Sequence, residues 1–78
     1  MRQRVINILQ GIIPTLEFTG DGNLIEEGLL DSLDVVMLTY ELEKEFRVKI
    51  DGADVKASNF NTVDDIVNML IQYGADES

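Results

Sequence analysis

A serine between two aspartates, in the run Asp31-Ser32-Leu33-Asp34, is the group in this sequence best placed to take part in chemistry. Asp31 is a good helix N-cap residue, and Asp34 stands three residues on, where the acidic partner of a capping box belongs. This spacing places Ser32 in the first turn of a helix. Free backbone N–H groups and the helix dipole favour an anion there. The pattern therefore predicts an exposed hydroxyl at a position that would stabilise an anionic group attached to it.

Ser32 is a poor candidate for a catalytic nucleophile. A catalytic serine needs a neighbouring base, and the sequence contains no histidine to supply one. The lysines (Lys44, Lys49 and Lys56) lie in charged stretches, without the burial that would lower an amine pKa. The sequence also contains no cysteine, which excludes disulfides, thiolate chemistry and cysteine-type zinc sites, and no metal site is predicted. We therefore expect that the chain is not an enzyme, and that Ser32 is a substrate which another enzyme modifies.

Composition limits the partners and the location of the chain. Seventy-eight residues predict a single domain spanning 1–78, and a hydrophobic fraction of 45% is ample for a packed core. With 15 acidic and 6 basic residues the net charge is −9, which argues against nucleic acid and suits basic patches on other proteins. No stretch approaches the roughly 20 apolar residues of a membrane span, and no convincing targeting segment is present. We expect a cytoplasmic monomer without stable membrane insertion.

The elements around Ser32 are predicted to be helices joined by irregular segments. A first helix over about 3–13 has apolar residues at helical spacing and is stopped by Pro14. A long loop over 14–31 follows, with a turn signal at Gly20-Asp21-Gly22-Asn23 and one helical turn near Asn23 to Glu27. The apolar residues that would hold this loop to the core are Leu16, Phe18, Leu24, Ile25, Leu29 and Leu30.

The second half of the chain completes an all-α fold, a small bundle of three to four helices. The helix over about 32–46 is amphipathic, a short helix over about 52–57 has Val55 as its apolar anchor, and a last helix covers about 62–73. Asn61 is the expected cap of the last helix, and Gly74 its expected end. The predicted core faces of these helices are Val35, Leu38, Leu42 and Phe46 in the second helix, and Val63, Ile66, Val67, Leu70 and Ile71 in the last.

With the elements placed, the chain resembles the acyl carrier protein family over nearly its whole length. The resemblance is carried by the Asp31 to Asp34 run at the start of the second helix, followed by Val36, Leu38, Leu42, Glu43, Glu45 and Phe46. It implies that Ser32 carries 4′-phosphopantetheine, transferred from coenzyme A by a phosphopantetheinyl transferase. At the matching position, Asp31 is implied to support a magnesium ion in that encounter. The terminal thiol of the arm would then hold acyl or aminoacyl intermediates as thioesters.

The resemblance leaves the cargo open. Leu29-Leu30 stands where fatty-acid carriers usually have a Gly-Ala type pair, and it looks more like D-alanyl and some other aminoacyl carriers. Phe60 favours the same group. Leu33-Asp34 matches the fatty-acid type, in keeping with fatty acid, polyketide or related biosynthesis. Lys44, by contrast, departs from the uniformly acidic second helix of fatty-acid carriers.

A second apolar stripe on the helix over 32–46 predicts a docking surface. Leu33, Met37 and Tyr40 follow at i, i+4 and i+7, and the acidic residues Asp34 and Glu41 flank them. Apolar anchors beside acidic residues suit loading and processing enzymes with basic docking patches. Alternatively, Met37 and Tyr40 pack on the long loop and the acidic residues only solvate the helix. A different class of function also stays open, namely a helical interaction domain that is never modified.

Overall fold

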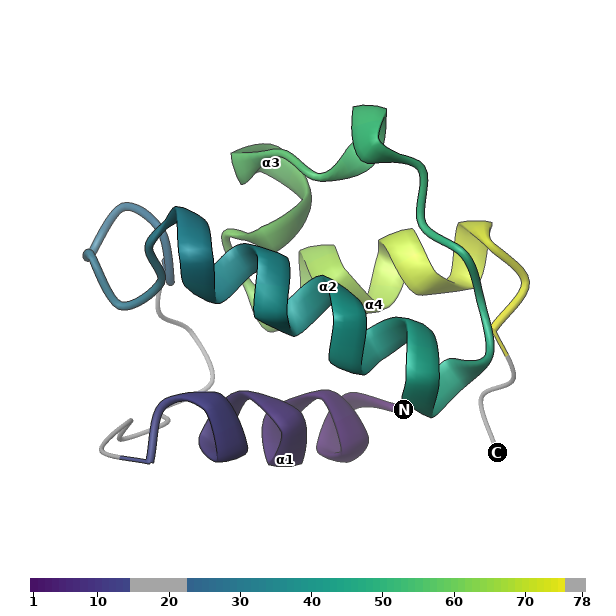
Figure 1. The fold of residues 1–78 in the computed structure, drawn as a ribbon, viewed down its shortest axis with the longest axis horizontal. Coiled ribbons are helices and arrows are strands. Elements are labelled where there is room, and N and C mark those ends of the chain that lie inside the picture. Colours follow the sequence, from purple (N-terminus) through teal and green to yellow (C-terminus); the bar gives the residue numbers. More distant parts are fainter. Residues whose placement is uncertain (15–22, 76–78) are drawn as a thin grey trace.

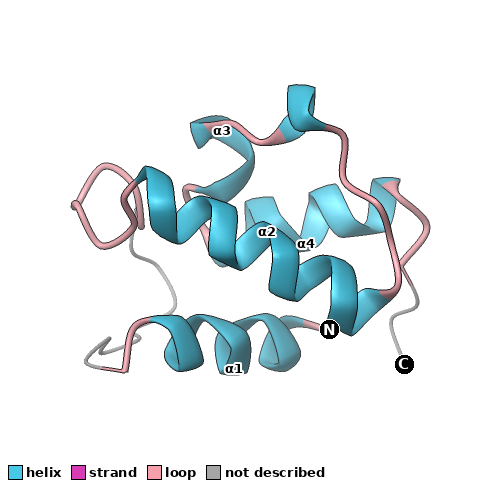
Figure 2. Cartoon of the chain, in the orientation of Figure 1, coloured by secondary structure: helices cyan, strands magenta, loops and turns pink. Residues whose placement is uncertain are grey.

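The computed structural model describes residues 1–14 and 23–75. In these ranges the chain forms four α-helices, one short 3-10 turn (η1) and no strand, which confirms the all-α prediction (Figures 1 and 2). None of the described helices is long and apolar enough to cross a membrane. The elements, in chain order, are α1 (Arg2–Ile12), α2 (Ser32–Phe46), η1 (Gly52–Asp54), α3 (Ala57–Phe60) and α4 (Val63–Gln72).

One core joins these elements, because α1 packs against both α2 and α4, and α3 packs against α4 (Figure 1). The prediction for the last helix was wrong at one position, since Ile71 is 44% exposed and Met69 is buried instead. Ile71 follows the fully buried Leu70, and one residue turns an α-helix by about 100°. The buried side chains are Val5, Leu9, Leu24, Leu30, Leu38, Leu42, Phe46, Ile50, Phe60, Val63, Ile66, Met69 and Leu70.

A salt bridge and a cation–π contact join the start of α1 to the end of α2. The Arg4 guanidinium donates to the Glu45 carboxylate through Nε at 2.9 Å and Nη2 at 2.8 Å, and Nη2 also donates to the Glu45 carbonyl oxygen at 3.0 Å. The same guanidinium lies 4.4 Å from the centroid of the Phe46 ring. Because Arg4 lies near the start of α1 and Glu45 near the end of α2, this contact joins neighbouring ends of two antiparallel helices (Figure 1).

The segment after α2 corrects the prediction of one short helix over 52–57. The structure has η1 and α3 instead, and Val55 and Lys56 between them are not helical. Asp51 caps only a 3-10 turn, in which the N–H of Asp54 donates to the Asp51 carbonyl at 2.9 Å. Lys56 is extended (φ −146°, ψ 159°) and becomes the N-cap of α3. Phe60, fully buried, is the side chain that anchors α3 in the core.

Asn61 has a different role from the predicted one. Thr62 is the N-cap of α4, and its Oγ1 accepts from the N–H of Asp65 at 3.0 Å. The Asn61 side-chain oxygen accepts instead from the N–H of Ile25 at 3.3 Å and of Glu26 at 3.5 Å. Asn61 therefore ties the segment that precedes α2 to the start of α4.

The described part of the long connection contains the helical turn that the sequence predicts. The N–H of Glu27 donates to the Asn23 carbonyl at 2.9 Å, an i to i−4 bond. Gly28 then takes a φ of +73°, a region that glycine enters at no steric cost, and the chain reverses so that the N–H of Leu29 reaches the Leu24 carbonyl at 2.8 Å. The turn signal at Gly20-Asp21-Gly22 and the anchors Leu16 and Phe18 lie outside the described residues.

The end of α2 stores backbone strain at Arg47, which is an exposed residue with φ 55° and ψ 45°. A left-handed conformation costs a residue with a Cβ more than it costs glycine. We expect Arg47→Gly to raise the free energy of unfolding by about 0.5–1 kcal/mol in chemical denaturation. Lys49→Gly, at an exposed position without positive φ, is the matched control and should lower it. A less stable Arg47→Gly protein would contradict the strain at this position.

Candidate functional site at the start of α2

The start of α2 is fixed by the capping box that the sequence predicts. The N–H of Asp34 donates to Asp31 Oδ1 at 2.8 Å, and the N–H of Asp31 donates to Asp34 Oδ2 at 3.3 Å. Asp31 itself is extended (φ −98°, ψ −177°), so the helix begins abruptly at the next residue. Ser32 is therefore the first residue of α2, and its side chain is exposed.

The free N–H groups of this helix end lie beside the Ser32 hydroxyl. The first turn of an α-helix has N–H groups without intrahelical partners. The capping box uses those of Asp31 and Asp34. The others, by their position in the first turn, belong to Ser32 itself and to Leu33, the residue that follows it. An anion attached to that oxygen would meet two N–H donors and the positive end of the helix dipole.

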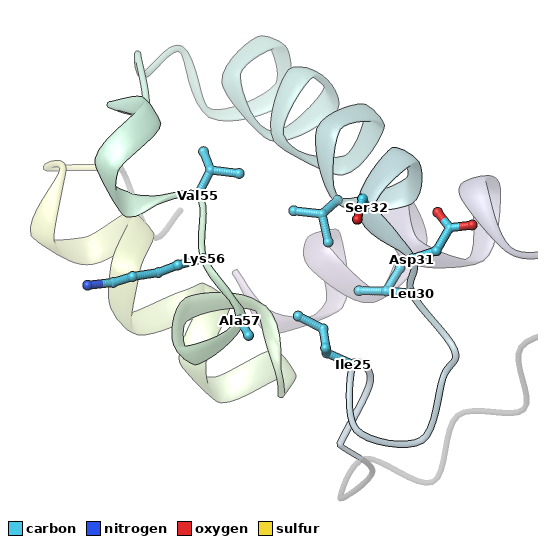
Figure 3. Close-up of a pocket in the computed structure, with 8 residues that line it drawn as sticks. Ile25, Leu30, Asp31, Ser32, Val55, Lys56 and Ala57 are labelled. Atoms are coloured by element: carbon cyan, nitrogen blue, oxygen red, sulfur yellow. The ribbon is translucent and has the colours of Figure 1, made fainter.

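An open pocket of about 400 Å³ lies next to Ser32. Ser32 and Asp31 line it from the start of α2, while residues 55–57 face them from the segment that leads into α3 (Figure 3). The Lys56 amine points away from Ser32 in this view. The complete lining is Ile25, Leu30, Asp31, Ser32, Val35, Val55, Lys56 and Ala57. A mostly apolar pocket that opens beside a hydroxyl can receive a group attached to that hydroxyl.

Two buried leucines hold Asp31 and Ser32 at the surface. Leu24 is 1% exposed and Leu30 is 3% exposed, so both ends of the turn before α2 are buried in the core. The N–H of Leu30 also donates to the Leu24 carbonyl at 3.0 Å. With Leu30 buried, the next two residues of the chain emerge at the rim of the pocket.

The predicted docking residues divide into two groups. Leu33, Met37 and Tyr40 are 67%, 47% and 59% exposed. Asp34 and Glu41 are only partly exposed and have local partners. Asp34 belongs to the capping box, and Glu41 Oε1 lies 4.0 Å from the amine of Lys44.

The structure adds residues that the sequence analysis did not assign to the docking surface or to a pocket. Val36 is 60% exposed on α2 and extends the stripe of exposed apolar residues. Its position three residues after Leu33 is the signal that could have found it, since i and i+3 share a helix face. Val55, Lys56 and Ala57 are assigned to the pocket by the tertiary structure, because no local pattern relates them to Ser32.

Comparison with known proteins identifies the family. The family model described as "Phosphopantetheine attachment site" matches residues 3–70. The chain belongs to this family of phosphopantetheine carriers. Similar proteins include the D-alanyl carrier protein of Lactococcus lactis subsp. cremoris (strain MG1363), 32% identical over 80 residues with full coverage of both chains. The D-alanyl carrier protein of Enterococcus faecalis is 33% identical, over 90% of this chain and 92% of its own length. The acyl carrier protein of Thermotoga maritima is 41% identical, over 69% and 64%.

Membership of this family makes the chain a carrier protein with covalently attached 4′-phosphopantetheine, and such carriers are in general not catalytic. The residues at the start of α2 fit this group. They offer an exposed hydroxyl for the bond, two N–H groups for the phosphate and an adjoining pocket, lined mainly by apolar residues, for the arm. Carriers of this family work with transferases that attach the arm and with enzymes that load it.

Proposed function

We propose that the carrier is modified on the Ser32 oxygen and that it presents a thioester-bound cargo to partner enzymes. The observation that carries this proposal is the exposed hydroxyl at the capped start of α2, beside the open pocket. A phosphopantetheinyl transferase would let this oxygen attack the pantetheine-bearing phosphorus of coenzyme A. The new Oγ–P bond forms as the P–O bond of the pyrophosphate bridge breaks, adenosine 3′,5′-bisphosphate leaves, and the hydroxyl proton passes to a base supplied by the transferase or solvent. The terminal thiol of the bound arm supplies the thioester chemistry.

Within this proposal the residues of the carrier orient and stabilise, and they do not react further. The N–H groups of Ser32 and Leu33 would be the donors available to the phosphodiester, at a helix end whose start is fixed by the capping box. Asp31 accepts the N-cap hydrogen bond through Oδ1, and its carboxylate would help to hold the magnesium ion in the transferase encounter. The chain then acts as a tether, which raises the effective concentration of the cargo at each partner's active site.

For the cargo, we favour a small aminoacyl group of the D-alanyl kind. Two of the D-alanyl carrier proteins above match more than nine-tenths of their own length to this chain. Leu30, at the position where this sequence departs from fatty-acid carriers, is buried under the pocket. A fatty acyl cargo is the second candidate, supported by the similarity to the acyl carrier protein of Thermotoga maritima and by Leu33-Asp34.

Intact-mass measurement tests both parts of the proposal. Incubation with coenzyme A and a broad-specificity phosphopantetheinyl transferase should add one phosphopantetheine group, and peptide fragmentation should place it on Ser32. The loaded protein is then offered D-alanine with a D-alanine-activating ligase, or a fatty acid with an acyl carrier protein synthetase. Transfer of D-alanine in preference to the fatty acid supports the aminoacyl assignment. Preference for the fatty acid would reverse it.

We further propose that exposed apolar residues of α2 form the docking face for these enzymes, with Leu33, Val36, Met37 and Tyr40 as anchors. Asp34 and Glu41 flank these anchors on α2 and add negative charge, which attracts a basic patch and speeds encounter. Lys44 makes the electrostatic potential of this face less negative toward the C-terminal end of α2, since its amine lies 4.0 Å from Glu41 and 5.3 Å from the centroid of the Tyr40 ring. Partners would therefore depend on the apolar anchors near Ser32.

Leu33→Ala is expected to slow loading by the transferase roughly 5- to 30-fold in kcat/KM, because a central apolar anchor contributes about 1–2 kcal/mol to binding. Thermal stability should hardly change, since Leu33 is 67% exposed. Ile71→Ala is the matched control, an exposed apolar residue on α4, and should leave loading unchanged. Equal loading rates in the two variants would rule out Leu33 as an anchor.

The cytoplasmic location and the monomeric state stay predictions.

A further inference from the structure

The C-terminal end of α4 holds the segment that leads to the far wall of the pocket. The Tyr73 hydroxyl accepts a hydrogen bond from the N–H of Asp51 at 3.0 Å and donates one to the Asp54 carboxylate. Asp51 and Asp54 are the N-cap and the last residue of η1. The bond to Asp54 is the main reason why the pKa of Tyr73 is raised above its ordinary value. One phenol thus bridges both ends of η1.

Within η1 itself, the contacts to the rest of the protein are polar. None of its three residues is buried, and the nearest core contacts along the chain are those of Ile50 before it and of the partly buried Val55 after it. The turn is internally closed, because Asp51 Oδ1 accepts from the N–H of Ala53 at 2.9 Å. Such internal bonds fix the shape of η1 but not its place on the protein. The Tyr73 hydroxyl supplies the link to α4.

Hydrogen bonds link η1 directly to the pocket wall formed by residues 55 and 56. The Asp54 carbonyl accepts from the N–H of Lys56 at 3.0 Å and from the Asn59 side chain at 2.8 Å. Val55, which follows Asp54, and Lys56 line the pocket opposite Ser32 (Figure 3). Asp54 therefore accepts a hydrogen bond from Tyr73 through its carboxylate, and its backbone carbonyl accepts the hydrogen bonds that join it to the wall.

We propose that Tyr73 is a positioning residue, which acts through Asp51 and Asp54 to keep the wall at residues 55–56 in place across from Ser32. The inference rests on the proposed attachment of the arm to Ser32, because it concerns the pocket beside that arm. Removing the hydroxyl should loosen residues 51–56 while α3 stays anchored by Phe60, which is fully buried. The arm would then lie against a wall that opens more often.

Tyr73→Phe removes the hydroxyl and keeps the ring. Hydrogen exchange on the unmodified protein should become roughly tenfold faster at the N–H groups of Val55 and Lys56, as expected when a link of one or two hydrogen bonds is lost. Neither N–H contacts Tyr73, since their acceptors are the carbonyl oxygens of Gly52 and Asp54. Asp54→Asn keeps an oxygen that can accept from Tyr73 and should retain slow exchange, whereas Asp54→Ala should exchange faster.

The second readout uses the loaded protein. The chain has no cysteine, so the thiol of the arm is its single thiol after loading. Its reaction with an aromatic disulfide reagent should be about twofold or more faster in Tyr73→Phe, because thiol reactivity depends on access. Unchanged exchange at Val55 and Lys56, or an unchanged thiol rate, would overturn the proposal. Failure of the arm to attach to Ser32 would instead contradict the proposed function. Hydrogen exchange at Val55 and Lys56 in the unmodified protein would still test the role of Tyr73.

Discussion

Ser32→Ala is expected to abolish the uptake of phosphopantetheine, because it removes the oxygen to which the phosphate would be joined. The variant should stay folded, since Ser32 is exposed and the N-cap contacts belong to Asp31 and Asp34. After incubation with coenzyme A and a phosphopantetheinyl transferase, the intact mass should equal that of the unmodified chain. Circular dichroism should show the same helix content as the wild type.

Ser58→Ala is the matched control for this experiment. Ser58 is also an exposed serine within a helix, α3, but it does not line the pocket beside Ser32. The control should gain one phosphopantetheine group at the wild-type rate. Uptake by Ser32→Ala together with loss of uptake by Ser58→Ala would move the attachment site to α3 and overturn the proposed function.

Phe60→Ala is expected to have the largest effect on stability. Phe60 is fully buried and is the one residue of α3 that reaches the core, so the variant loses the transfer free energy of the ring and leaves a cavity. Such changes cost about 3–5 kcal/mol, which approaches the whole free energy of unfolding of a small domain. Urea denaturation should show a variant that is largely unfolded or close to it at 25 °C.

Phe60→Leu is the control that preserves most of the buried volume. It should lower the free energy of unfolding by no more than about 1.5 kcal/mol, because a hydrophobic residue of similar size refills the site. Loading at Ser32 should survive in Phe60→Leu and fall in Phe60→Ala in proportion to the unfolded fraction. A Phe60→Ala protein as stable as the wild type would contradict the anchoring of α3 by this side chain.

Both predictions follow because the attachment site and the contacts that stabilise the fold involve different residues. Ser32 lies at a helix end that carries little of the packing, so chemistry there is separated from stability. The wall across the pocket depends on α3 and η1, whose positions come from Phe60 and from the hydrogen bonds of Tyr73. We therefore expect changes at α3 and η1 to affect how the arm is sheltered, and changes at Ser32 to decide whether it is attached.

Features that arise between neighbours along the chain could be predicted from the sequence alone. The capping box of Asp31 and Asp34, the core stripe at Leu38, Leu42 and Phe46, and the positive-φ Gly74 just past the C-cap of α4 are all local patterns. Caps and helical periodicity involve residues three or four positions apart, so their physics does not depend on the rest of the fold. For the same reason, local spacing was enough to select the serine at the start of α2.

Contacts between distant segments depended on how the helices pack. Asn61 has the side chain of a cap, but it holds residues 25 and 26, more than thirty positions earlier. Phe60 falls between the predicted helices over 52–57 and 62–73, although its burial anchors α3. Tyr73 meets Asp51 across the fold. A polar side chain bonds to whichever partner the packing of helices brings near, and no local spacing encodes that choice. The hydroxyl of Ser32 was therefore foreseeable, whereas the pocket beside it was not.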